Sequence, residues 1–210
     1  MPYESLNLSW EKKWWNKGFR YVVGVDEVGR GSLAGPVVAA GVVFPSQVKP
    51  IKGVNDSKKL SSNQRGKLEP IIKRTASDYA LASVSVKVIN QKGIEWATME
   101  AMKRVVKKMK RTQVVLVDGN RAPRLPKEVE VKSIVGGDNQ VYSIAAASIL
   151  AKEYRDRLMR RLNRKYCAYG FAENKGYGTQ KHRQAIYKYG VTICHRKLFV
   201  RKILVDNGNN

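Results

Sequence analysis

Apolar residues fall into short β-branched runs and into longer segments with helical spacing. The short runs predict five strands, which cover residues 21–26, 37–44, 80–88, 113–117 and 129–135. A glycine-rich turn of residues 29–36 joins the first two strands, and so short a link favours an antiparallel hairpin. A helix precedes the fourth strand, so a right-handed crossover would place that strand parallel to the first.

The helical segments begin near the N-terminus, where Leu6, Trp10 and Trp14 share one face of a short helix. Residues 51–60 form a polar loop, after which Ser61 or Ser62 caps a helix that runs to about residue 75. Further helices are predicted over residues 94–110, from 138 or 139 to about 162, and over 179–189, where Gly190 ends the last one. The predicted fold class is therefore α/β, a mixed five-stranded sheet flanked by helices with a C-terminal helical extension.

A length of 210 residues fits one domain with appendages. We expect an N-terminal helical segment over residues 1–18, a core over residues 19–165, and a basic helical extension over residues 166–210. No apolar run approaches the roughly 18 residues of a membrane span, and the N-terminus lacks the apolar core of a secretory signal.

Charge narrows the range of partners. The chain has 40 Lys and Arg against 17 Asp and Glu, a net charge of +23 and a pI of about 10.2. Such an excess favours a polyanion, and three basic clusters at residues 103–111, 155–165 and 196–202 favour a groove that follows a nucleic-acid backbone. The two cysteines and two histidines exclude a disulfide framework and a multi-histidine metal centre, and they indicate a reducing, cytoplasmic compartment.

The scarce acids mark the candidate chemistry. Asp26 and Glu27 close the first strand and Asp118 closes the fourth, so Asp26 and Asp118 would face each other across roughly 5 Å if the strands are neighbours. Carboxylates that close favour a hard cation such as Mg²⁺ or Mn²⁺, although strand-end aspartates also cap turns. Asp156, flanked by two arginines, reads by itself as a surface ion pair, and Glu153 one turn earlier competes with it for any acidic role.

Three polar turns could contact a nucleic acid. Gly29, Arg30 and Gly31 allow close backbone approach to a sugar or phosphate, although ordinary tight turns use the same residues. The loop from Asn55 to Lys59 offers donors for phosphates, and Tyr177 places a ring between two glycines, where it could stack or simply pack.

Taken together, these residues resemble the ribonuclease HII family over about residues 21–199. The motifs that carry the resemblance occur in the family's order and approximate spacing. They are VDEVGRG (25–31), LAGP (33–36), DSKKL (56–60), VDGN (117–120), AAASILAK (145–152), RDR (155–157) and GYGT (176–179) with His182.

The resemblance implies a ribonuclease H-like catalytic core whose C-terminal extension contacts the duplex. It implies cleavage of RNA strands in RNA/DNA hybrids and nicking of DNA 5′ of single embedded ribonucleotides. The expected mechanism is two-metal hydrolysis with Mg²⁺ or Mn²⁺, giving 5′-phosphate and 3′-hydroxyl ends. The implied catalytic and metal-binding acids are Asp26, Glu27, Asp118 and Asp156. The implied substrate-binding residues are Gly29, Arg30, Gly31, Asn55, Ser57, Lys58, Ser148, Lys152 and Tyr177.

Two positions depart from the family pattern. Ser32 stands where proline is frequent, and Glu153 adds a fifth acid. The C-terminus shows no convincing sliding-clamp motif, which leaves a sliding-clamp interaction doubtful. We expect a monomer that binds RNA/DNA hybrids and DNA containing ribonucleotides, with no membrane partner. The alternatives are another metal-dependent nuclease of the same fold and a non-catalytic hybrid-binding protein.

Overall fold

A computed structural model describes residues 6–206 and contains one five-stranded sheet. The strands are β1 (Val22–Val28), β2 (Val37–Val43), β3 (Asp78–Val84), β4 (Val114–Asp118) and β5 (Glu130–Ile134), in the spatial order β3-β2-β1-β4-β5. β1 and β2 form the predicted antiparallel hairpin, and β3 pairs antiparallel with β2. β4 lies parallel to β1, as the crossover argument predicted, and β5 lies parallel to β4.

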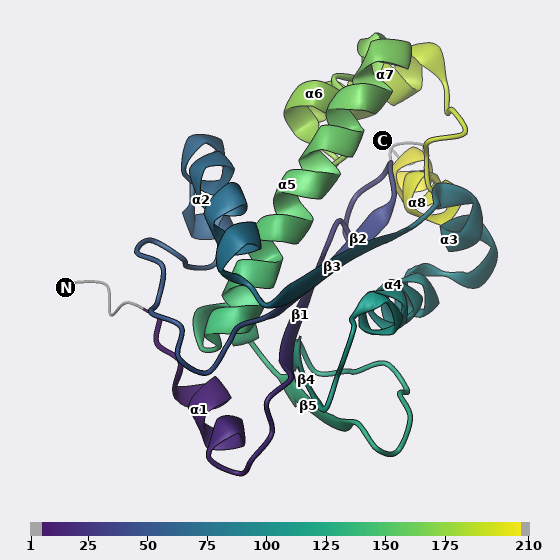
Figure 1. The fold of residues 1–210 in the computed structure, drawn as a ribbon. Helices are drawn as coiled ribbons and strands as arrows, with labels where there is room; N and C mark the ends of the chain where they lie inside the picture. Colours follow the sequence, from purple (N-terminus) through teal and green to yellow (C-terminus); the bar gives the residue numbers. More distant parts are fainter. Residues whose placement is uncertain (1–5, 207–210) are drawn as a thin grey trace.

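Helices cover both faces of the sheet (Figure 1). α4 (Ile94–Lys108) packs its small apolar stripe against one face, and the long helix α5 (Tyr142–Lys165) packs against the other. Every residue of β2 is buried because its alternate side chains enter the two opposite cores. Gly24 in β1 allows α5 to approach closely, since an added Cβ there would overlap the backbone of Ser143 and Ile144. The predicted fold class is thus confirmed.

Two smaller helices cover the side of the sheet near α5. α1 (Ser9–Trp15) packs with its tryptophans near the start of β1, and α2 (Ser62–Thr75) packs on α5. Ser61 is the N-cap of α2: its hydroxyl accepts a hydrogen bond from the Gln64 N–H, and the Gln64 side chain accepts one from the Ser61 N–H in return. This capping box explains why the polar run ends in a helix at that residue.

The C-terminal extension has a small core of its own. It contains α6 (Phe171–Asn174), α7 (Gln180–Tyr189) and α8 (Lys197–Asp206), and its apolar cluster also includes Leu33 and Ala34 from the β1–β2 turn. Thr179 caps α7 through the His182 N–H, and Gly190 ends the helix as predicted. The extension therefore packs directly on the turn that follows β1. Residues 1–5 and 207–210 of the two predicted end segments lie outside the described residues.

Two element predictions were wrong in detail. The third strand ends at Val84, and the residues assigned to its second half form α3 (Val86–Lys92). There the spacing of Val86 and Ile89, both buried, is that of a helix and not of a strand. The helix predicted to start at Asp138 or Asn139 starts at Tyr142, because residues 137–139 form a separate 3₁₀ turn.

Between residues 6 and 206, none of the helices combines the length and the apolar composition needed to cross a bilayer.

Candidate active site

Three aspartates converge at the carboxyl end of the parallel strands. Asp26 lies near the end of β1, Asp118 ends β4, and Asp138 lies in the 3₁₀ turn that follows β5. One carboxylate oxygen from each lies within 4.8 Å of those from the other two. The strand-end argument correctly placed Asp26 beside Asp118, since the register aligns Val25 with Val117, directly before them.

Hydrogen bonds fix the orientation of these carboxylates. Asp26 Oδ1 accepts a bond from the Glu27 N–H at 2.7 Å, and Asp118 Oδ1 accepts one from the Gly137 N–H at 2.7 Å. Asp138 is 2% exposed, and its Oδ2 accepts a bond from Lys58 Nζ at 2.9 Å. Lys58 thus brings a cation from the 55–60 loop to the edge of the cluster.

The crowding of negative charge changes the proton affinity of the cluster. Burial, followed by the charges of Glu27 and Asp118, raises the pKa of Asp26 well above its ordinary value. Burial and the nearby Asp138 raise the pKa of Asp118. Burial also raises the pKa of Glu27, although the Arg30 guanidinium, 3.5 Å from its carboxylate, opposes that change. Burial and neighbouring negative charge therefore make Asp26 and Asp118 harder to ionise.

The cluster has the chemistry of a hard-cation site. All of its donors are carboxylate oxygens, and their mutual repulsion is what a divalent cation would relieve. Burial alone would lower the pKa of Lys58, but its hydrogen bond and charge interaction with Asp138 raise it overall, so the ammonium stays charged. One ammonium at the edge leaves most of the negative charge of the cluster uncompensated.

Sequence reasoning missed Asp138. It was assigned as a possible helix start, whereas it follows β5 at the same edge of the sheet as Asp26 and Asp118. The strand-end argument that identified Asp118 would also have identified Asp138 if it had been extended to the fifth strand.

Asp156 lies apart from this cluster, about four turns along α5. Its carboxylate is 2.9 Å from Lys152 Nζ and 3.6 Å from an Arg65 guanidinium nitrogen. Glu153 pairs with the same Arg65 at 2.9 Å. The geometry thus does not support Asp156 as a fourth ligand: Asp156 is buried with cations of its own, and the extra acid Glu153 has a basic partner.

The buried Arg155 packs against the Gly29-Arg30-Gly31 turn. Gly29 has φ +92°, and an added Cβ would lie 2.8 Å from Cδ and Cζ of Arg155 and closer still to Nε. The Arg155 guanidinium donates to the carbonyls of Pro36 and Lys175 at 3.0 and 2.8 Å. It also donates to the hydroxyl of Ser32 at 2.9 Å, which gives that unusual residue a role.

A second buried arginine connects the same turn to the C-terminal extension. Arg196 donates to the Arg30 carbonyl at 2.7 Å and twice to the Gly35 carbonyl, at 3.1 and 2.9 Å. Burial and the neighbouring Arg155 lower its pKa to about 9. Within the described residues, no carboxylate forms an ion pair with either guanidinium, so backbone carbonyls hold both charges. Nothing in the sequence pattern had marked Arg196 for this role.

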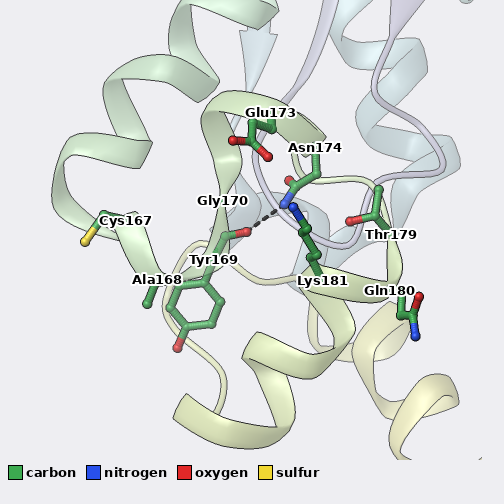
Figure 2. Close-up of a pocket in the computed structure, with 9 residues that line it drawn as sticks. All are labelled: Cys167, Ala168, Tyr169, Gly170, Glu173, Asn174, Thr179, Gln180 and Lys181. Atoms are coloured by element: carbon green, nitrogen blue, oxygen red, sulfur yellow. Dashed lines mark hydrogen bonds between the residues drawn. The ribbon is translucent and has the colours of Figure 1, made fainter.

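Tyr177 lies beside that turn and is 37% exposed. Its ring is 5.5 Å from the Arg155 guanidinium, and the preceding Gly176 carbonyl accepts bonds from the N–H groups of Leu33 and Ala34. Asn174 holds the turn on the other side: its amide donates to the Tyr169 carbonyl at 2.6 Å, as Figure 2 shows, and its oxygen accepts a bond from the Gly176 N–H.

Two buried histidines hold the backbone of Tyr177. His182 Nδ1 lies 2.9 Å from the Tyr177 carbonyl oxygen and must donate to it, so its bare Nε2 accepts from His195 Nε2 at 3.2 Å. His195 Nδ1 in turn accepts a bond from the Thr192 N–H at 2.9 Å. Burial lowers the pKa of both rings, that of His195 to about 4 with His182 contributing, so both are neutral near pH 7.

The remaining predicted contact residues fall into two places. The buried Ser57 accepts a hydrogen bond from Ser148 at 2.6 Å, and this contact ties the loop that carries Asn55 and Lys58 to α5. Lys152 instead pairs with Asp156, away from the aspartate cluster. The structure therefore brings Lys58 to the cluster and ties its loop to Ser148 on α5, and it pairs Lys152, one turn further along that helix, with Asp156.

Comparisons with known proteins agree on one family. A family sequence profile described as "Ribonuclease HII" matches residues 23–202. A ribonuclease HII of Thermosynechococcus vestitus is 46% identical over 201 residues, which cover 96% of this chain and 94% of that protein. The crystal structure of ribonuclease H2 from Pyrococcus horikoshii superimposes with a TM-score of 0.74 at 27% identity, covering 90% of this chain and 99% of the other. The ribonuclease HII of Archaeoglobus fulgidus, solved in complex with PCNA, gives a TM-score of 0.69 at 27% identity, covering 84% and 93%.

Proposed function

This chain belongs to the ribonuclease HII family, and from that premise we propose that it nicks DNA 5′ of single embedded ribonucleotides. Membership makes it a metal-dependent nuclease of the ribonuclease H class, which acts on RNA/DNA hybrids. The observation that carries the finer proposal is the convergence of Asp26, Asp118 and Asp138 at one edge of the sheet, beside the Gly29-Arg30-Gly31 turn.

We assign the metal ligands from that convergence. Asp26, Asp118 and Asp138, with Glu27 next to them, would hold two cations of the Mg²⁺ or Mn²⁺ kind, and Asp138 takes the place first given to Asp156. Bound cations supply the positive charge and Lewis acidity that phosphodiester hydrolysis with 5′-phosphate and 3′-hydroxyl products requires. The raised pKa values of Asp26 and Asp118 reflect burial first and then repulsion between the carboxylates, and a bound cation would relieve that repulsion.

The chain's own residues place the substrate. The ammonium of Lys58 lies at the cluster with 78% of its side chain exposed, so it can attract a phosphate without leaving Asp138. The backbone of residues 29–31 would read the 2′-hydroxyl, the feature that separates RNA from DNA at one position. Tyr177 would pack against the next sugar, and the basic extension of residues 166–210 would hold the duplex.

We propose that the chain works as a cytoplasmic monomer and reaches its substrate through its own basic surface. The Archaeoglobus relative was solved with PCNA. We propose no sliding-clamp contact for this chain.

A set of labelled duplexes tests the function. One contains a single ribonucleotide, one is an RNA/DNA hybrid and one is all DNA, each incubated with Mg²⁺ or Mn²⁺. We expect a single nick on the 5′ side of the lone ribonucleotide and no cutting of all-DNA duplex. Asp26→Asn should abolish cleavage while duplex binding persists, because one negative charge is removed. Equal cutting of all-DNA duplex would contradict the proposal.

A further inference from the structure

A second depression adjoins the candidate active site. A small hollow at the candidate active site is lined by Glu27 and Asp118 on its acidic side and by Met99 and Arg121 on the other side. Met99 and Arg121 also line a larger depression of about 600 Å³ that lies between α4 and the chain after β4. We call this the Trp96 depression, and its lining residues are Trp96, Met99, Glu100, Lys103, Arg121, Ala122, Pro123 and Arg124. The two hollows are therefore adjacent and share Met99 and Arg121.

Trp96 is unusually open for its type. It is 45% exposed on the first turns of α4, whereas the core stripe of that helix is made by Ala97, Ala101 and Val105. Core packing thus does not account for an indole at this position. A half-exposed indole beside a catalytic hollow is the kind of surface that contacts a sugar or a base.

The charge around Trp96 is positive. Lys103 and Arg124 are exposed, and among residues 6–206 neither forms an ion pair. The single acid of the lining, Glu100, is paired at 2.7 Å with Arg104. Two cations without a carboxylate partner therefore line the same depression as the ring, where each could contact a phosphate of a strand whose sugar or base packs on Trp96.

We propose that the Trp96 depression is a substrate subsite that binds the backbone of the strand carrying the scissile bond, beyond the acidic cluster. Trp96 would pack against a sugar or base, and Lys103 and Arg124 would contact phosphates. A nucleic-acid strand is the occupant favoured by the charge and by the position next to the hollow of Glu27 and Asp118. The inference rests on the proposed function and extends its substrate contacts to a face remote in sequence from the C-terminal extension.

Duplex binding measured by fluorescence anisotropy in EDTA, where metal-dependent cleavage is off, tests the subsite. Trp96→Ala should weaken binding at least about fivefold, and Trp96→Phe should restore most of it because a π-face remains. Lys103→Gln with Arg124→Gln should reduce the slope of log affinity against log salt by up to about two, one for each lost phosphate contact. Lys12→Gln, on exposed α1 near the opposite end of β1, is the matched control and should change neither quantity by as much.

A second set of measurements, with shortened duplexes, locates the contact. Together with the nicking assay, it also distinguishes failure of the subsite from failure of the proposed function. Shortening the duplex on one side of the ribonucleotide should abolish the Trp96→Ala deficit, and shortening it on the other should not. If the wild-type chain nicks at the ribonucleotide but Trp96→Ala and the double variant bind like wild type, the subsite is refuted and the function stands. A Trp96 that serves a protein partner would give that same result. If the wild-type chain fails to nick, the function is refuted, and the binding measurements still decide the subsite.

Discussion

Replacing Gly29 with alanine tests how rigidly the turn after β1 is held. Gly29 combines a backbone conformation of φ +92° with a guanidinium directly where a Cβ would lie. Alanine there must therefore strain the backbone and also displace Arg155. Because Arg155 holds the carbonyls of Pro36 and Lys175, its displacement would loosen the contact between the turn and the C-terminal extension.

Two costs add up for Gly29→Ala. A left-handed conformation costs a residue with a Cβ about 1–2 kcal/mol, and overpacking of a filled site costs about 1–3 kcal/mol. Alanine lowers the entropy of the unfolded chain, which returns about 0.4–1 kcal/mol. The net loss should be roughly 1–4.5 kcal/mol in the free energy of unfolding, a drop in Tm of about 2–18 °C for a chain of this length.

Gly31→Ala is the matched control, two residues away in the same turn. An added Cβ at Gly31 meets no atom within 4 Å, and Gly31 is not among the residues of positive φ. Urea unfolding of both variants should therefore show a loss for Gly29→Ala and a change within about 1 kcal/mol for Gly31→Ala. If the two variants unfold alike, the Arg155 support inferred for this turn is incorrect.

Further predictions concern the acids, the histidines and the charge. Asp138→Asn should lower cleavage about 100-fold or more, whereas Asp156→Asn should retain most cleavage and lose stability, because Lys152 would lose a buried partner; the reverse order would restore Asp156 as the ligand. The pKa of His195 falls from 6.5 to about 4 on folding. Between pH 4 and pH 6.5 the ring is therefore protonated in the unfolded chain and neutral in the folded chain. The contribution of this group to the free energy of unfolding is therefore complete above pH 6.5, and up to about 3 kcal/mol of it is lost as the pH falls toward 4. Urea unfolding at several pH values should show a weaker pH dependence of stability for His195→Gln than for the wild-type chain. Duplex affinity should fall steeply between 50 and 200 mM salt, as titrations at several salt concentrations would show, and a flat response would argue against phosphate-dominated binding.

Much of the fold could be read from local patterns. Three local signals each predicted the correct element, because each lies within a few neighbouring residues. They are the apolar run of 37–44, the capping serine at 61 and the apolar stripe of 94–110. The pattern failed at residues 85–92, where a short apolar run fits a strand or a helix equally well. There, the packing of Val86 and Ile89 against the core decided the outcome.

In the candidate site, too, some residues could be placed from the sequence and others only from the tertiary structure. The strand-end position of Asp26 and Asp118 follows from parallel strands that end together, so the sequence by itself determined that pair. The same argument, extended to the fifth strand, applies to Asp138. What the sequence could not show is that Asp156 pairs with Lys152 and Arg65, because Arg65 comes from a distant helix. The contacts that hold the 29–31 turn could not be predicted from local sequence either. Arg155 and Arg196 lie more than 120 residues from it in the chain, and only tertiary packing brings them to the carbonyls of Pro36 and Arg30. Local patterns determine elements, whereas contacts between distant segments determine which of the scarce acids and abundant bases act together.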